Sequence, residues 1–217
     1  MENIFTTDNL IFVLNGLLLT LEISITTIIT SLIFGTLLAL MRTYGNKLVK
    51  IIATIYIEFF RNTPNLLWIL LVAFSVTFVD SPYLKGVFSF TLFTSAVVAE
   101  VIRGGLNAID KGQFEAAASQ GFNFRQTLWY IIMPQCIQLI VPSLVSQITT
   151  IIKDTSYLSQ VATPEFLWQC KVIMGSVTVT STMFVIFGSI AFTYFVINFS
   201  ISLLARMLQT SNHLARG

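Results

Sequence analysis

Two carboxylate–guanidinium sets interrupt otherwise apolar runs of this sequence. Glu58 and Arg61 stand in the stretch EFFRNTP, and Glu100 and Arg103 stand in AEVIRGG. Residues three apart on a helix share a face, so each carboxylate can neutralise the guanidinium of its own set. We interpret both sets as structural ion pairs. For Glu58 and Arg61 a substrate role is the alternative; Pro64, beside them, is expected to free a backbone carbonyl and to kink the helix.

A second kind of cluster, KDTS, closes another apolar run with Lys153, Asp154, Thr155 and Ser156. A small ligand that carries both an ammonium group and a carboxylate would need a cation, an anion and small hydrogen-bonding groups together. Helix ends near such a site would help to bind the carboxylate. Two interpretations stay open: a substrate path, or an adjacent ion pair that caps a helix end.

The motifs of common enzyme sites are missing from the sequence. It contains no GxxxxGK[ST] phosphate loop, no HExxH, no CxxC and no GxSxG. The only histidine stands in the terminal tail, which removes most acid–base and metal chemistry. We therefore predict no catalytic residue, no metal site and no cofactor bound by this chain.

The composition indicates what kind of elements carry these residues. Of the 217 residues, 55% are hydrophobic and 10% are charged, and the mean hydropathy is +0.81. Soluble domains carry about 25% charged residues. In hydrocarbon every backbone group must be satisfied within a helix or a closed barrel, and the runs lack the period of two that strands show. The sequence predicts an all-α polytopic membrane protein.

Five apolar runs are long enough to span, at about 20 residues each. They are Leu10 to Met41, Ile51 to Val79, Tyr83 to Ile102, Ile131 to Ile152 and Thr182 to Leu208. We expect about five transmembrane helices in a single domain over 1–217. The first run is too long, and lacks the small-residue cleavage site, for a removable signal peptide. Within it, Glu22 either faces a pore or reaches outward to the interface.

Basic residues predict the orientation. With the N-terminus outside, the inner segments hold Arg42, Lys47, Lys50, Arg103, Lys111, Arg125, Arg206 and Arg216, and the outer segments hold Lys85, Lys153 and Lys171. Cytoplasmic loops carry the excess of Lys and Arg in membrane proteins. The C-terminus and a loop over about 103–134 are therefore expected in the cytoplasm.

That loop contains the stretch EAAASQGFNFRQTLWYIIMP, from Glu115 to Pro134. Its alanines allow another backbone close, its glycine permits a sharp change of direction, and its aromatic residues are typical interface anchors. A short helix–glycine–helix of this kind suits docking into a groove, and an ordinary amphipathic interfacial helix is the alternative. The residues expected to contact a partner are Glu115, Ala116, Ala117, Gly121, Phe122, Phe124 and Arg125.

The spacing of this stretch resembles the EAA signature of ABC importer permeases. Glu115-Ala116-Ala117 is followed after three residues by Gly121, after nine more by Ile131, and then by Met133-Pro134, where the family usually has Leu before the proline. The stretches YIEFFRNTP, AEVIRGG, GQFEAA, MPQCIQLIVPSL and KDTSYLSQV are similar, in this order, to the permeases for polar amino acids. Ala96-Val97 and the segment from Phe166 to Thr182 depart from that pattern.

The resemblance implies a type I ABC importer permease fold and a subunit that is not itself an enzyme. Its expected partners are cytoplasmic ABC ATPase subunits that bind ATP and Mg²⁺, an extracytoplasmic substrate-binding protein, and a second permease copy or a paralogue. The substrate would be a polar amino acid, and no nucleic acid would be involved. The protein would be located in a bacterial cytoplasmic membrane. A non-transporting membrane component of an ATPase complex, with an assembly or sensory role, is the alternative.

Overall fold

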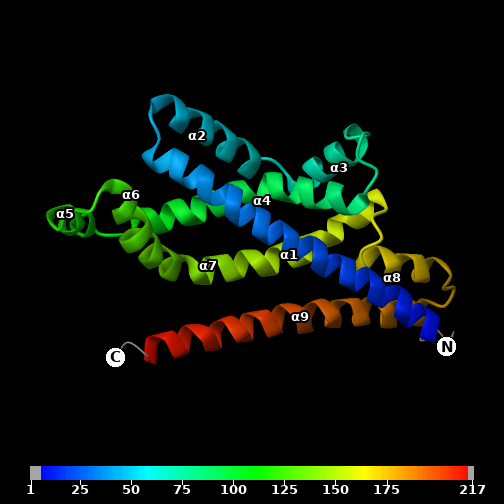
Figure 1. Cartoon of the computed structure of the whole chain (residues 1–217). Coiled ribbons are helices and arrows are strands. Elements are labelled where there is room, and N and C mark those ends of the chain that lie inside the picture. Colours follow the sequence, from blue (N-terminus) through cyan, green and yellow to red (C-terminus); the bar gives the residue numbers. More distant parts are fainter. Residues whose placement is uncertain (1–5, 215–217) are drawn as a thin grey trace. The chain divides into compact units, whose positions relative to one another are not determined.

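The computed structural model describes residues 6–214, with side chains described as far as residue 207, and every regular element in that range is a helix. The elements are α1 (Thr7–Tyr44), α2 (Lys47–Arg61), α3 (Asn65–Ser75), α4 (Pro82–Asn107), α5 (Lys111–Ser119), α6 (Phe124–Gln126), the π-helical turn η1 (Thr127–Ile132), α7 (Met133–Asp154), the 3-10 helix η2 (Thr155–Val161), α8 (Phe166–Gly175) and α9 (Thr180–Leu214) (Figure 1). The predicted all-α class is confirmed.

Four stretches within the described residues are long and apolar enough to cross a membrane. They are Thr7–Tyr44, Pro82–Asn107, Phe124–Val161 and Thr180–Met207. Four of the five expected spans therefore exist as continuous helical stretches, in the expected order.

The fifth expected span, over Ile51 to Val79, is broken into α2 and α3. Pro64 has no N–H and cannot continue a helix. The last carbonyls of α2 are satisfied locally: the Asn62 side chain donates to the Glu58 carbonyl at 2.7 Å, and the Thr63 hydroxyl lies 2.9 Å from the Phe59 carbonyl and 3.3 Å from the Phe60 carbonyl, which Pro64 leaves without its helical donor. With 11 residues, α3 is too short to cross a core about 30 Å thick. Where a kink was expected at Pro64, the run is divided into two helices, and α3 continues it as a shorter apolar helix.

The chain forms two compact units. Unit 1 comprises Met1–Ile29, Asn65–Thr91 and Ile148–Gly217, and unit 2 comprises Thr30–Pro64 and Leu92–Gln147. The helices α1, α4 and α7 each contribute residues to both units. The single domain expected over 1–217 stays a prediction.

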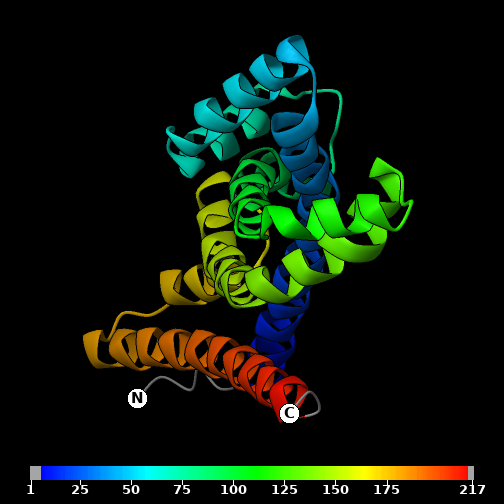
Figure 2. The ribbon, with the colours of Figure 1, turned by 90° about the vertical axis from the view of Figure 1, so that its left-hand side faces the viewer.

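Unit 2 has a core of close helix contacts between α1, α2, α4, η1 and α7. Small residues permit these contacts, as they do between helices in membranes. A Cβ at Gly35 of α1 would lie 2.7 Å from Val98 of α4, and one at Gly105 of α4 would overlap Ile140 and lie 2.8 Å from the sulfur of Cys136 on α7. Figures 1 and 2 together show α5 running crosswise to α4 and α7.

Unit 1 has two cores. One joins α1, α3, α4 and η2 around Ile23, Phe90 and Leu158, and the other joins α8 and α9 around Phe166 and Ile190. Here α3 and α8 both pack against η2, and α8 packs against α9. These contacts position the end of α7 and the start of α8, and the polar residues of unit 1 that are described below lie at these two helix ends.

Candidate functional site

The glycine turn after α5 is a Schellman motif. The Phe122 amide donates to the Ala117 carbonyl at 3.1 Å, and the Gly121 amide donates to the Ala118 carbonyl at 3.0 Å. This pattern places a left-handed residue just after the helix, and Gly121 has φ +84°. The sequence-based expectation of a sharp turn at Gly121 is confirmed. A Cβ on Gly121 would meet no atom within 4 Å, so its backbone conformation, and not crowding, requires glycine.

The second half of the segment is fixed by a capping box. The Asn123 side chain accepts from the Gln126 amide at 3.0 Å, and the Gln126 side chain accepts from the Asn123 amide at 2.9 Å. Two orphan amides at the start of α6 are thereby satisfied. The Gln135 side chain of α7 donates to that of Gln113 on α5 at 3.1 Å. The segment from α5 to η1 is therefore a defined element that α7 supports.

The predicted coupling residues divide into exposed and buried sets. Ala117 is buried and therefore supports the turn from inside, whereas the other six are exposed: Glu115, Ala116, Gly121, Phe122, Phe124 and Arg125. Phe124 also packs edge-on against Tyr44 of α1, with ring centroids 5.2 Å apart. Farther along the segment, Leu128 is buried in the core of unit 2, while Trp129 is 53% exposed.

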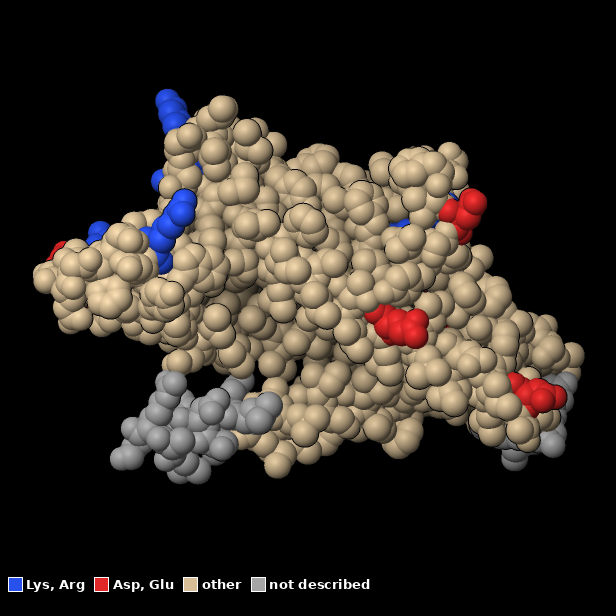
Figure 3. Space-filling model, in the orientation of Figure 1, with Lys and Arg blue, Asp and Glu red and all other residues tan. Residues whose placement is uncertain are grey.

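Basic side chains surround this surface. Lys47, Lys50, Lys111 and Arg125 are exposed residues of unit 2. On the face drawn in Figure 3, blue side chains gather over α2 and the α5–α6 segment. The segment therefore presents a carboxylate, Glu115, and apolar rings within a mainly cationic surface.

Glu100 lies at the centre of an ion network in unit 2. It accepts hydrogen bonds from both Arg42 and Arg103, the latter through Nε at 2.9 Å and Nη2 at 2.8 Å, and Arg61 lies 3.4 Å away. Arg42 also pairs with Glu58 at 2.9 Å. Bidentate, charge-assisted hydrogen bonds of this kind are stronger than hydrogen bonds between neutral groups.

The network corrects one predicted pairing. Glu100 and Arg103 pair as expected, but Glu58 pairs with Arg42 of α1, and Arg61 pairs with Glu100 of α4. Both residues of the EFFRNTP stretch therefore connect α2 to other helices instead of to each other. Sequence reasoning missed Arg42 because its partners stand 16 and 58 positions away.

The KDTS residues end α7 in unit 1, where the chain tightens into η2. Lys153 is exposed, whereas Asp154 accepts from the Asn65 amide at 3.4 Å. Thr155 is buried and donates to the Ile152 carbonyl at 2.7 Å, and Ser156 is half-buried. The other amide atom of Asn65, Oδ1, is buried without a hydrogen bond. Asn65 begins α3, so a helix N-terminus, an amide oxygen and a carboxylate lie together here.

Glu165 is a polar residue that the sequence analysis did not single out. It is 0% exposed and caps α8, with Oε1 accepting from the Trp168 amide at 2.7 Å and Oε2 from the Leu167 amide at 2.9 Å. Thr20 of α1 accepts from the Phe166 amide at 3.1 Å. Burial raises the pKa of the Glu165 carboxyl to about 7, against the lowering effect of its hydrogen bonds. The sequence offered little signal for this cap, because Ser, Thr, Asp and Asn are the residues that typically cap a helix N-terminus.

The raised pKa of Glu165 predicts a pH-dependent stability. Because the folded protein binds this proton more tightly than the unfolded chain, the free energy of unfolding should fall as pH rises from about 4.5 to about 7 and then level off. Thermal unfolding between pH 5 and pH 8 measures this. In Glu165→Gln, which keeps the cap neutral, the decrease should be smaller than in the wild type. An identical pH profile in both proteins would contradict the assignment.

Among the described residues, no group of three or more His, Cys, Asp or Glu side chains could hold a metal ion. The described residues form a multi-pass helical arrangement with four candidate membrane spans, a defined turn-and-helix element after α5, and charged residues near helix ends.

Comparison with known proteins identifies the family. The profile of the "Binding-protein-dependent transport system inner membrane component" family matches residues 31–212. The chain is 36% identical over 208 residues to the probable glutamine ABC transporter permease protein GlnP of Bacillus subtilis (strain 168), which covers 94% of this chain and 95% of that protein. It is 31% identical to the glutamate/aspartate import permease protein GltK of Escherichia coli O6:H1, over 91% of this chain and 92% of that one.

Solved structures agree with these relatives. The crystal structure of an amino acid ABC transporter with histidines matches with a TM-score of 0.82 at 30% identity, over 92% of this chain and 94% of that chain. The MetNI methionine ABC transporter, in an inward-facing conformation, matches with a TM-score of 0.80 at 15% identity, which supports the fold alone. The chain belongs to the binding-protein-dependent transport system inner membrane component family and is an ABC transporter permease of the plasma membrane.

Proposed function

We propose that this chain is the permease subunit of an ABC importer for polar amino acids, with glutamine as the first candidate substrate. Nearly full-length similarity to a glutamine permease carries the proposal. Transport would be driven by ATP and Mg²⁺ bound to a separate ATPase subunit. An extracytoplasmic binding protein would deliver the substrate, and a second copy or a paralogue would complete the pathway.

The α5–η1 segment is the proposed contact with the ATPase. It offers what helix-in-groove docking needs: a short helix, exposed rings at Phe122 and Phe124, and a carboxylate at Glu115. Its shape is set by the Schellman turn and the capping box, and α7 supports it through Gln135. A push on α5 can therefore be transmitted to a membrane-spanning helix through a rigid connection.

The end of α7 is the proposed substrate contact. Asp154 can bind an α-ammonium group, and the unpaired Oδ1 of Asn65 can accept a second hydrogen bond from it. The first amides of α3 suit a carboxylate, as discontinuous helices do in other transporters. Lys153, Thr155 and Ser156 complete the proposed group, with Lys153 on the exposed side.

Reconstitution tests the proposal. The chain, its partner ATPase and the binding protein are incorporated into liposomes, and ATP hydrolysis and uptake are measured with each polar amino acid. We expect glutamine, delivered by the binding protein, to stimulate both. ATPase stimulation without uptake for any amino acid would favour a sensory role. If no amino acid changed ATP hydrolysis or uptake, the proposal of import would be contradicted.

The proposed orientation predicts a labelling pattern. Unit 2 contains Arg42, Lys47, Lys50, Arg61, Arg103, Lys111 and Arg125. Arg206 lies in unit 1, and Arg216 lies outside the described residues. A cysteine at the exposed Ser119 should resist an impermeant thiol reagent in intact cells, and one at the exposed Asp80 should react. The two native cysteines are buried and provide the unlabelled background. Labelling in the reverse pattern would overturn the orientation and with it the coupling role.

Asp154→Asn should impair uptake without loss of the ATPase. The substitution keeps the side chain's size and a hydrogen bond to Asn65 but removes the charge proposed to bind the ammonium group. We expect KM for uptake to rise about tenfold, as for the loss of one charge-assisted hydrogen bond. Co-purification of the ATPase serves as the folding control. Wild-type uptake kinetics would reduce the cluster to a helix cap.

A further inference from the structure

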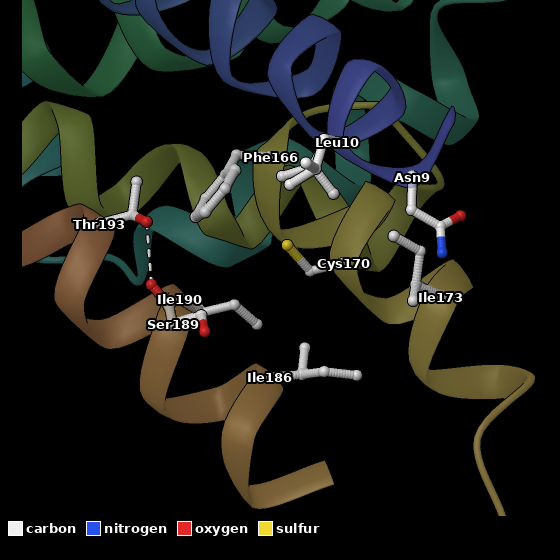
Figure 4. A pocket seen from close by; sticks show the side chains of 10 residues that line it. Asn9, Leu10, Phe166, Cys170, Ile173, Ile186, Ser189, Ile190 and Thr193 are labelled. Carbon is white, nitrogen blue, oxygen red and sulfur yellow. Dashed lines mark hydrogen bonds between the residues drawn. The ribbon is translucent and has the colours of Figure 1, made fainter. Parts of the chain in front are cut away.

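An apolar cavity of about 180 Å³ lies within unit 1, between the first turns of α1, the helix α8 and the first half of α9 (Figure 4). Its apolar walls are formed by Leu10 and Val13 of α1, Phe166 and Ile173 of α8, and Ile186 and Ile190 of α9. A cavity of about 150 Å³ with a Leu, Ile and Phe lining stays dry and binds benzene. The space is therefore large enough for a segment of hydrocarbon.

Both hydroxyl groups of the wall donate hydrogen bonds within α9, and Asn9 is a further polar residue of the lining. The Thr193 hydroxyl donates to the Ser189 carbonyl at 2.9 Å (Figure 4), and the Ser189 hydroxyl donates to the Val185 carbonyl at 2.9 Å. Burial, with a contribution from the Glu165 carboxyl, raises the pKa of the Cys170 thiol to about 12, so the thiol stays neutral. A buried water needs two to four polar partners. The cavity thus favours an apolar occupant.

The surroundings of the cavity decide which apolar molecule reaches it. Two of its walls, α1 and α9, belong to candidate membrane spans, and only 11% of the apolar window of α9 is buried, against 56% for α4. Leu10, which lines the cavity, is 55% exposed, so an apolar side chain stands at the rim beside the exposed Ser189. A face of this kind borders hydrocarbon in a membrane, where lipid chains are the abundant apolar ligand.

We propose that this cavity binds one acyl chain of a membrane phospholipid. The acyl chain would fill the space beside the α8–α9 core, to which Phe166, Ile186 and Ile190 belong. The bound acyl chain would contact α8 and the two candidate spanning helices, α1 and α9. Because a ligand that binds only the folded state stabilises it by mass action, the thermal stability of the permease should depend on the lipid supplied.

Photolabelling tests the proposal on the intact transporter complex in lipid nanodiscs. The probe is a phosphatidylglycerol with a diazirine in one acyl chain, and labelled peptides are mapped by mass spectrometry. Labels should concentrate on cavity residues of α8 and α9. Ser189→Leu adds volume at the exposed rim and should reduce this labelling at least fivefold, with a smaller rise in thermal midpoint when lipid is added to detergent. Val185→Leu, exposed on the same helix outside the lining, should leave both unchanged.

A second variant addresses the interior of the cavity. Ile190→Phe fills the space from the buried side and should lower the labelling in the same way; if it reduces the folded yield, Ser189→Leu at the rim decides. Equal labelling of Ser189→Leu and Val185→Leu would overturn the proposal. So would a cross-link from a diazirine amino acid at position 190 to a second protein chain in place of lipid. Either result can occur with uptake intact, so the test is independent of the proposed substrate.

Discussion

Gly121→Val should abolish uptake while the protein still inserts in the membrane. Gly121 holds φ +84° in the Schellman turn after α5. A β-branched residue in this region costs about 1–3 kcal/mol, and each 1.4 kcal/mol is a factor of ten in population. The docking shape of the α5–η1 segment should be populated about fivefold to a hundredfold less. Uptake into reconstituted liposomes and the amount of co-purified ATPase measure the effect.

Two matched variants separate conformation from bulk in this test. Gly121→Asn should retain most activity, because Asn tolerates the left-handed region at a helix end. Gly188→Val places the same side chain on a helical glycine of α9 that also has no atom within 4 Å of a Cβ, and it should leave ATPase binding unchanged. Loss of uptake in Gly121→Asn as severe as in Gly121→Val would show that the turn conformation is not what matters. Full transport in Gly121→Val would leave the coupling role without support.

Local features of this fold could be predicted because they depend on neighbouring residues. The Gly121 turn follows from the glycine itself, and the break at Pro64 from the missing N–H, although only a kink within one span was expected at that proline. The apolar runs predicted four spans correctly because hydrocarbon leaves the backbone only the helical choice. The composition of the Glu115 segment likewise predicted a short helix, a turn and exposed rings.

Pairings between distant residues could not be predicted in the same way. Asn65 and Asp154 stand 89 positions apart, and Thr20 and Glu165 stand 145 apart. Any Arg of the sequence could have paired with Glu58, and the helical spacing favoured Arg61, whereas the packing of α1 brings Arg42 to it. The burial of Ala117 could not be predicted either, because its exposed neighbours are alanines too and only the geometry of the turn buries its side chain.

The second large expected effect is a loss of stability when the ion network around Glu100 is disrupted. Glu100→Gln should strongly destabilise the permease, because its carboxylate faces Arg42, Arg61 and Arg103. The Glu100 side chain is 15% exposed, and leaving partly buried guanidinium groups without their carboxylate costs about 3–5 kcal/mol. We expect the thermal midpoint in nanodiscs to fall by about 10 °C and the folded yield to fall with it.

Glu58→Gln is the matched control for that loss. The Glu58 side chain is 46% exposed and pairs with Arg42 alone, while Arg42 keeps its bond to Glu100. Exposed pairs contribute about 0–1 kcal/mol, so this midpoint should shift by only a few degrees. Adding Arg103→Gln to Glu100→Gln removes the guanidinium held by two hydrogen bonds and should restore part of the stability. Because replacing both partners costs less than orphaning one, a double variant less stable than Glu100→Gln would mean that Arg103 acts through packing and not through its charge.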